Sequence, residues 1–313
     1  AITPGRENPP DKGFSRIYLP NGEVVLLQDL LNELPVECLG EAHYKRFGPK
    51  LGILVKIFDV GDDAHIPVHW HPSPEFSKKY LNDPNGKNEA WIVLDTRPGA
   101  KTWIGWKEDI TREQFMTWLE NQDRQAMLEH MHVFEPKVGD VIFLRDSIVH
   151  SLGEGCCVLE PQEPTDWNIL AEWEGFPYGK EDAHLGLGWD VALKAADFSR
   201  MDRDYLDNYC VRKPRVVREE DGSQEIEYLP EEARQYFWFS QLKVPTELSA
   251  PTSNSFYGMI GTQGQAVLKG DWGETPIRRG LGILIPACLG PFKVVNRGDR
   301  PFEAVCCFPP ATG

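Results

Sequence analysis

The sequence is short of positive charge. Its 33 lysines and arginines face 48 aspartates and glutamates, which gives a net charge of -15. Because nucleic acids and anionic membrane surfaces bind clustered cations, this deficit argues against both partners. Long apolar runs are also lacking, so no stretch resembles a membrane-spanning helix. The first residues, AITPGRENPPDKG, lack the charged and apolar regions of a signal peptide. We therefore expect a cytoplasmic protein.

Spaced cysteine pairs are missing as well. The seven cysteines are odd in number and show no zinc-ribbon spacing, so we expect reduced thiols rather than a disulfide framework or a cysteine-bound metal. Histidine is absent from the C-terminal part, since all eight histidines lie within the first 184 residues. Any metal site built on imidazoles must therefore belong to the N-terminal part.

Hydrophobic residues are not scarce. They make up 41% of the 313 residues, enough for a sizeable core in one or two domains. Short apolar or alternating runs recur between Gly, Pro and Asp, among them GILVKIFDVG, AWIVLDTRPG, KTWIGW and DVIFLRDSIVH. This spacing is typical of a sandwich or barrel rather than of βαβ units. We expect a mostly β fold of two jelly-roll barrels with a few inserted helices.

Three segments are expected along the chain. Residues 1–184 would form a metal-binding domain, with an inserted helix that begins after Thr111, where Gln114 completes a capping-box pattern. Residues 185–234 would form a helical and polar connector, and residues 235–313 a second barrel without metal. Laying Gly139 on Gly280 aligns two segments that each run from glycine through an apolar strand to a turn, which favours an internal duplication.

A metal site is predicted from four residues of the first barrel. Residues two apart in a strand share a face, so His69 and His71 can direct both rings to one point while Trp70 faces away. Glu89 opens the run EAWIVLD, and His150 ends DVIFLRDSIVH. Three imidazoles and a carboxylate suit zinc, iron, manganese, cobalt or nickel better than calcium or magnesium. His-x-His alone is weak evidence, and the HMH at residues 130–132 closes a helix and favours a surface or packing role.

These residues lie in motifs that resemble the type I mannose-6-phosphate isomerases, a branch of the cupin superfamily. The motifs include GPKLGILVKIFDVGDDAHIPVHWHP, NGKNEAWIVLDTRPGAKTWIGWKEDITREQF and VGDVIFLRDSIVHSLGEGCCVLEPQE. The resemblance covers the chain from about Gly48 onward, and its Gly-Lys-x-Glu element, Gly86 to Glu89, is its most specific part. It implies two cupin-type barrels and one divalent metal, most simply zinc. The implied ligands are His69, His71, Glu89 and His150, where the family has glutamine at the first position.

The resemblance implies interconversion of an aldose and a ketose by proton transfer between C1 and C2. Lys87 and Lys56 match family lysines, and Glu160 in VLEPQE is the candidate acid/base. One departure is clear, because the family's arginine-bearing segment is replaced by PTDWNILAEWEGFP, which has no arginine. Arg145 is a candidate to replace that charge, although a surface role is the alternative for it.

Three functions remain open at this stage. The first is a metal-dependent isomerase acting on a sugar or sugar phosphate, and the second is a cupin dioxygenase using iron at the same ligands. The third is a non-catalytic sugar-binding cupin, which the missing arginine favours. Trp167 and Trp173 lie in the replaced segment, so an unphosphorylated sugar is a further possibility.

Overall fold

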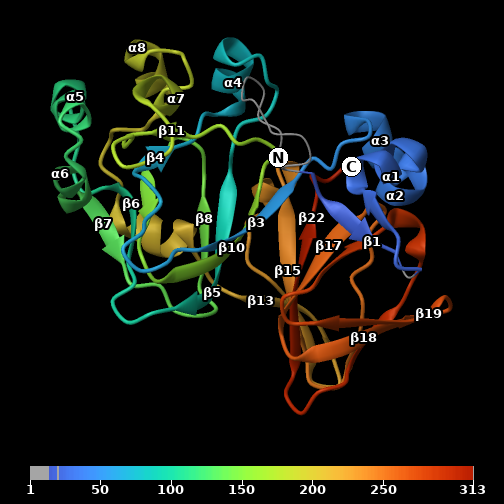
Figure 1. Cartoon of the computed structure of the whole chain (residues 1–313). Coiled ribbons are helices and arrows are strands. Elements are labelled where there is room, and N and C mark those ends of the chain that lie inside the picture. Colours follow the sequence, from blue (N-terminus) through green and yellow to red (C-terminus); the bar gives the residue numbers. More distant parts are fainter. Residues whose placement is uncertain (1–13, 20, 313) are drawn as a thin grey trace. The chain divides into compact units, whose positions relative to one another are not determined.

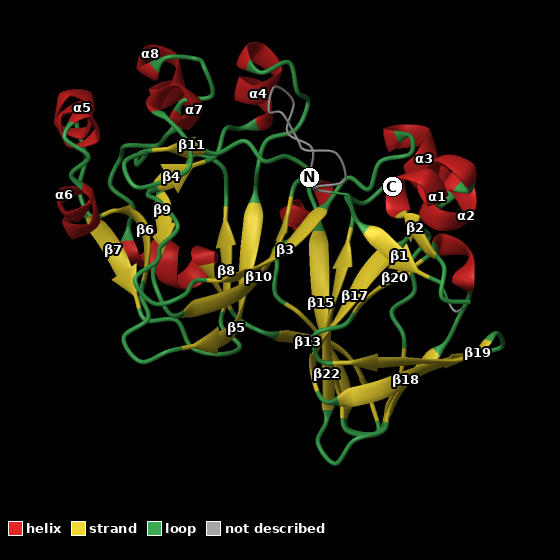
Figure 2. Ribbon diagram, viewed as in Figure 1, coloured by secondary structure: helices red, strands yellow, loops and turns green. Residues whose placement is uncertain are grey.

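The computed structural model describes residues 14–19 and 21–312, most of whose regular structure is strand (Figure 2). Contacts between residues divide the chain into two units. Residues 54–212 form one unit, and the described residues up to 53 together with those from 213 onward form the other. We call them the inner and the outer unit by their order in the sequence alone, because the first is flanked on both sides by segments of the second. The outer unit is thus discontinuous in sequence, whereas the three predicted segments are contiguous.

The inner unit consists of two five-stranded sheets. In spatial order the first contains β12 (Val211–Arg212), β8 (Val141–Leu144), β5 (Glu89–Thr96), β10 (Cys156–Gln162) and β3 (Leu54–Asp59). The second contains β11 (Ile169–Leu170), β4 (His69–Trp70), β9 (His150–Leu152), β6 (Thr102–Trp106) and β7 (Met131–Phe134). Within each sheet all the pairings are antiparallel. The expected jelly-roll class, which is typical of cupins, is confirmed.

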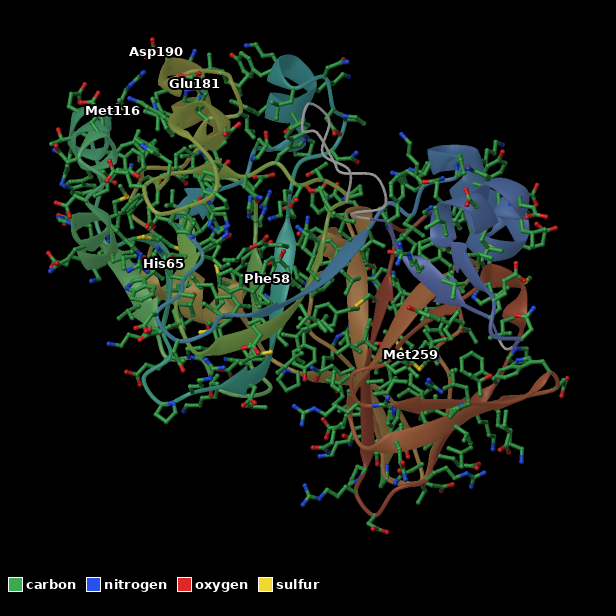
Figure 3. All side chains as sticks on the ribbon, in the orientation of Figure 1. Phe58, His65, Met116, Glu181, Asp190 and Met259 are labelled. Carbon is green, nitrogen blue, oxygen red and sulfur yellow. The ribbon has the colours of Figure 1, made fainter. Side chains whose placement is uncertain are left out.

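An apolar core lies between these sheets. Alternate side chains face it, including Trp91 and Val93 of β5, Ile104 of β6 and Val158 of β10. Phe58 of β3, labelled in Figure 3, packs against the same core. Because strand alternation continues to the strand ends, the polar residues at positions 56, 89 and 160 occupy the same inner face.

A second apolar cluster covers the other face of the β4–β9–β6 sheet. Trp70, Trp106 and Val149 pack there against Phe115 and Leu119. Trp70 therefore faces away from His69, as predicted. The helix expected to start after Thr111 is confirmed at its start, where the Thr111 hydroxyl accepts from the Gln114 amide.

That helix is nevertheless broken into α5 (Arg112–Glu120) and α6 (Arg124–Glu129). Gln122 between them has a φ of 51°, which an α-helix does not allow, and Asp123 caps the second helix. The remaining helices of the unit are α4 (Pro74–Tyr80), α7 (Lys180–Ala183), α8 (Trp189–Ala192) and α9 (Arg203–Tyr205). Helices α4, α7 and α8 lie toward the end of the unit that carries β4 and β11 (Figure 1).

The outer unit repeats the two-sheet arrangement. Its six-stranded sheet runs β13 (Arg215–Glu220), β14 (Ser223–Glu227), β15 (Trp238–Val244), β22 (Phe302–Phe308), β17 (Tyr257–Gln263) and β20 (Gly282–Ile285). Its four-stranded sheet runs β16 (Glu247–Ser249), β21 (Lys293–Asn296), β18 (Gln265–Gly270) and β19 (Gly273–Arg278). The polar part of the predicted connector forms the β13–β14 hairpin, which pairs with β15.

Further elements of the outer unit come from the start of the chain. They are the paired strands β1 (Arg16–Tyr18) and β2 (Val24–Leu26) and the helices α1 (Leu27–Glu33), α2 (Pro35–Leu39) and α3 (Glu41–Phe47). These helices belong to this unit because Ser255 donates to the Leu39 carbonyl at 3.0 Å, and Arg46 to the Ala311 carbonyl at 2.8 Å. No helix in the described part of the chain has the length and apolarity needed to span a membrane.

The two glycines aligned from the sequence occupy equivalent turns. Gly139 has a φ of 90° and precedes β8, and Gly280 has a φ of 79° and precedes β20. Both positions lie in the region of backbone space that favours glycine. The turn-then-strand correspondence between the two units is therefore present in the structure.

Candidate metal centre

Four side chains of the inner unit converge on one point, as the sequence predicts. His69 lies in β4, His71 directly follows it, Glu89 begins β5 and His150 begins β9. One donor atom from each residue lies within 4.8 Å of the others, and all four side chains are buried. The pairing of β4 with β9 sets His69 opposite His150, with ring centres 4.1 Å apart. We call these four residues the His/Glu cluster.

Each imidazole of the cluster is oriented by a backbone carbonyl. The Nδ1 atoms of His69, His150 and His71 lie 2.7, 2.8 and 3.2 Å from the carbonyl oxygens of Pro67, Ile148 and Trp167, respectively. A carbonyl oxygen can only accept, so each Nδ1 carries the proton and each Nε2 keeps its lone pair. Metal-binding histidines are held in the same way.

Glu89 brings a buried carboxylate into this set. Neither of its oxygens makes a hydrogen bond of acceptable geometry, and the same holds for Nε2 of His150. Its Oε2 lies 3.1 Å from Nε2 of His71, and its Oε1 lies 3.2 Å from Nε2 of His150. Tetrahedral donors at about 2.0–2.2 Å from a zinc ion are about 3.3–3.6 Å apart. Buried acceptors that face one another at nearly this spacing fit a divalent cation.

Burial also sets the protonation of the cluster. It lowers the pKa of His71 to about 3, and together with the nearby His150 it lowers the pKa of His69 well below 6.5. Burial by itself would raise the pKa of Glu89, but the Lys87 ammonium and the contacts with His71 and His150 together outweigh it, and the pKa is lowered. Neutral imidazoles beside a carboxylate are the forms that bind a metal.

Lys87 is buried beside the cluster. Its Nζ lies 3.0 Å from a Glu89 oxygen and 3.3 Å from Nε2 of His71, and it donates to Asn168 at 2.8 Å. Burial opposes its charge, but Glu89 and then Glu160 more than offset this effect and raise its pKa. Lys87 is therefore a fixed positive charge at the cluster.

Gly86 explains why the motif begins with glycine. A Cβ at this position would lie 2.8 Å from the Pro72 carbonyl oxygen and 2.8 Å from Pro74. The Lys87 amide donates to that same Pro72 carbonyl at 3.2 Å, and Thr165 donates to the Gly86 carbonyl at 2.6 Å. This close packing fixes the path of the chain into β5.

Glu160 and Lys56 lie opposite each other in the pairing of β10 with β3. The Trp91 indole donates to Glu160 at 3.0 Å, and burial, reinforced by Glu89, raises the pKa of Glu160 to about 7. Lys56 is more exposed and pairs with Asp166 at 2.5 Å. Both side chains are therefore on the face that carries the cluster. The His/Glu cluster, Lys56, Lys87 and Glu160 together form a set that we call the polar layer.

A hydrogen-bonded bridge missed by the sequence reasoning supports the cluster. The Asn88 amide and side chain donate to the buried Glu163 at 3.0 and 2.6 Å, and the Asn88 oxygen accepts from the Asp146 amide at 3.1 Å. Asn88 precedes Glu89, and Asp146 lies in the turn that leads to His150. The bridge thus ties together two of the segments that carry candidate ligands. Its only sequence signal is that Asn88 fills the variable position of Gly-Lys-x-Glu.

The segment that lacks the family arginine lies beside the polar layer. Asp166 pairs with Lys56, and Asn168 accepts from Lys87. The carbonyl of Trp167, between them, contacts His71, and the Trp167 indole donates to Asp83 at 3.2 Å. With only 6% of Trp167 exposed, its ring is a packing element rather than an open stacking surface. The sequence placed this segment near the site but did not identify Asp166 or Asn168.

The other candidates lie elsewhere. Arg145 is exposed in the turn between β8 and β9 and lines a hollow of about 410 Å³ with Gly105, Ser147 and Asp197. The lining of this hollow includes no member of the His/Glu cluster. His65, labelled in Figure 3, pairs with Glu172 at 2.7 Å. His130 and His132 contact the carbonyls of Ala126 and Met201, in agreement with the packing role predicted for them.

Comparison with known proteins supports the resemblance found in the motifs. No family model matches the chain. It is 28% identical over 167 residues to mannose-6-phosphate isomerase ManA of Bacillus subtilis, covering 52% of this chain and 50% of that protein. It is 26% identical over 151 residues to mannose-6-phosphate isomerase of Streptococcus mutans, covering 47% of this chain and 46% of that protein. The chain thus spans about half the length of these curated relatives.

Solved structures show the same fold over more of the chain. The mannose 6-phosphate isomerase from Bacillus subtilis superposes with a TM-score of 0.75 at 19% identity, covering 98% of this chain and 88% of that one. A variant of phosphomannose isomerase from Salmonella typhimurium gives a TM-score of 0.71 at 17% identity, covering 95% and 88%. The chain is a divergent relative of the mannose-6-phosphate isomerases.

Proposed function

We propose that this divergent relative of the mannose-6-phosphate isomerases is a metal-dependent aldose–ketose isomerase acting on a sugar or sugar phosphate. The observation that carries the proposal is the His/Glu cluster, with Lys87 and Glu160 beside it on one inner face. The curated relatives are named for this class of reaction. The matched stretch covers only about half the length of these relatives, so the activity is proposed for this chain rather than carried over from them.

The proposed ligands are His69, His71, Glu89 and His150, and the proposed metal is zinc. Three neutral nitrogens and one carboxylate oxygen are a common zinc donor set, and iron, manganese, cobalt or nickel accept it too. A divalent ion held there would polarise the carbonyl and hydroxyl oxygens at C1 and C2 of the sugar.

Glu160 is the proposed acid/base group. It takes the proton from C2 of the aldose and returns it to C1, while the hydroxyl proton moves from O2 to O1, which converts aldose to ketose through an enediol. A pKa of about 7 suits this exchange, because the carboxyl can both accept and release a proton near neutral pH. The Trp91 indole holds one oxygen of Glu160 in place.

Lys87 is the proposed electrostatic partner of the reacting oxygens. Its raised pKa keeps it charged, and Asn168 fixes its position. Such a fixed cation stabilises negative charge that develops on the sugar oxygens during proton transfer. Lys56 is proposed to orient the substrate from the more exposed side. Arg145 remains an untested candidate, and its place in a separate hollow argues for the surface role.

Isotope exchange tests this proposal. The purified protein is incubated in deuterated water with a panel of aldoses and their 6-phosphates, and ketose formation and deuterium at C1 of the ketose are measured. We expect both signals, their loss with Glu160→Gln, and their retention with Glu174→Gln, which changes an exposed glutamate. Oxygen consumption with bound iron would instead support the dioxygenase, and sugar binding without exchange would support the non-catalytic protein.

A further inference from the structure

We infer that the sugar handled by this site carries no phosphate, and that Asp166 is the residue that selects against one. This inference rests on the proposed isomerase function and narrows its substrate class. It starts from the segment at residues 164–177, which lacks the arginine that the resemblance implies and which contains Asp166.

Asp166 lies at the edge of the polar layer that solvent reaches. The side chains of His71 and His150 are fully buried, Glu89 is 1% exposed and Lys87 4% exposed. The side chains of Lys56 and Asp166 are each 25% exposed. Exposure therefore increases from the cluster toward the Lys56–Asp166 pair, which is the part of the polar layer that a solvent molecule or a charged group can contact.

The lysines of the polar layer already have carboxylate partners. Lys56 pairs with Asp166 at 2.5 Å, and Lys87 lies 3.0 Å from Glu89. A phosphate dianion that approached Lys56 would have to compete with the Asp166 carboxylate and would be repelled by it. Glu160, directly across from Lys56 in the sheet, adds further negative charge when it is ionised.

The backbone holds Asp166 in this position. On one side Thr165 donates to the Gly86 carbonyl at 2.6 Å. On the other side Trp167 contacts His71 through its carbonyl and Asp83 through its indole, both at 3.2 Å. With both neighbours anchored, Asp166 cannot leave the edge of the polar layer without breaking contacts to the cluster.

A neutral sugar suits the same edge. A carboxylate accepts hydrogen bonds from sugar hydroxyl groups without the charge repulsion that a phosphate meets. Lys56 and the Asn168 amide are donors that a hydroxyl oxygen can use. The same residues that repel a phosphate can therefore recognise a row of hydroxyl groups.

The test compares mannose with mannose 6-phosphate. The ratio of the two kcat/KM values is measured for the wild type, Asp166→Asn, Asp166→Glu and Asp62→Asn, which breaks an exposed ion pair with Arg97 on the surface. We expect the wild type to prefer mannose at least about tenfold, and Asp166→Asn to shift the ratio toward the phosphate by about tenfold. Asp166→Glu and Asp62→Asn should keep the preference for mannose.

A wild type that prefers mannose 6-phosphate would overturn the inference, as would an unchanged ratio in Asp166→Asn. Binding of both sugars, followed by tryptophan fluorescence, gives the same comparison without turnover. If neither sugar is isomerised, the proposed function fails while the binding ratio still decides the role of Asp166. Circular dichroism of each variant shows whether it is folded, and Asp166→Ser serves as a second neutral variant.

Discussion

Replacing Glu160 by glutamine should stabilise the metal-free protein at alkaline pH while it abolishes isomerisation. Burial raises the pKa of Glu160 from 4.5 to about 7, so the folded chain holds this proton more tightly than the unfolded chain. Below about pH 4.5 the carboxyl is protonated in both states and does not lower the free energy of unfolding. As the pH rises from about 4.5 to about 7, the unfolded chain ionises first, and the free energy of unfolding falls. At about 1.4 kcal/mol per pH unit, the full cost is about 3 kcal/mol.

Glu160→Gln removes this cost and keeps an acceptor oxygen for the Trp91 indole. Urea unfolding in the presence of a chelator, followed by circular dichroism at pH 5 and pH 8.5, measures the effect. We expect a small difference from wild type at pH 5 and a gain approaching about 3 kcal/mol at pH 8.5. Glu174→Gln is the control for an exposed glutamate and should show neither effect. A difference that is independent of pH, or a variant less stable than wild type at pH 8.5, would refute the reasoning.

Two substitutions test the supports of the site, and a pH profile tests Glu160 as the base. Asn88→Ala removes the side-chain donor to Glu163 and the acceptor of the Asp146 amide, while the backbone amide of residue 88 still donates to Glu163. We therefore expect a loss of about 1.5–3 kcal/mol in unfolding free energy and metal affinity weaker by about 10- to 100-fold, measured by calorimetry. Gly86→Ala should cost about 1–3 kcal/mol, because its Cβ meets Pro72 and Pro74, whereas Gly61→Ala, where a Cβ meets nothing within 4 Å, should be nearly neutral in thermal unfolding. The initial rate of isomerisation should rise with pH through about 7 as Glu160 ionises, and a flat pH profile would exclude it as the base.

The metal-ligand candidates could be found from the sequence because strand geometry determines them. His69 and His71 share a face by alternation, and Trp70 packs on the opposite face as expected. Glu89 opens a strand as the sequence suggests, whereas a turn divides the run DVIFLRDSIVH, so that His150 begins β9 rather than ending the preceding strand. Their convergence in the structure supports the predicted ligand set, and the metal itself stays a prediction.

The supports of the site could not be found in this way. Asn88 meets Glu163 and Lys56 meets Asp166 through contacts between loops and strands far apart in the sequence. Such pairs leave no periodic signal, because at least one partner of each pair lies in a loop outside the strands. The role of residues 164–168 was visible in the sequence only as a missing arginine.

Local geometry also determines two features of the chain. The helical pattern after Thr111 continues past Glu120, but the left-handed Gln122 breaks it into two helices. The N-terminal residues join the outer unit through bonds such as that of Arg46 with the Ala311 carbonyl. Neither feature is encoded by hydrophobic spacing.

Metal content measured together with ketose formation tests the central claim most directly. Wild-type protein is analysed for bound metal, assayed before and after chelation, and compared with His150→Ala and with His130→Ala, a histidine outside the cluster. The His/Glu cluster predicts about one divalent ion per chain, lost with activity on chelation and in His150→Ala, and retained in His130→Ala. Unchanged metal content in His150→Ala, or full ketose formation by metal-free protein, would contradict the claim.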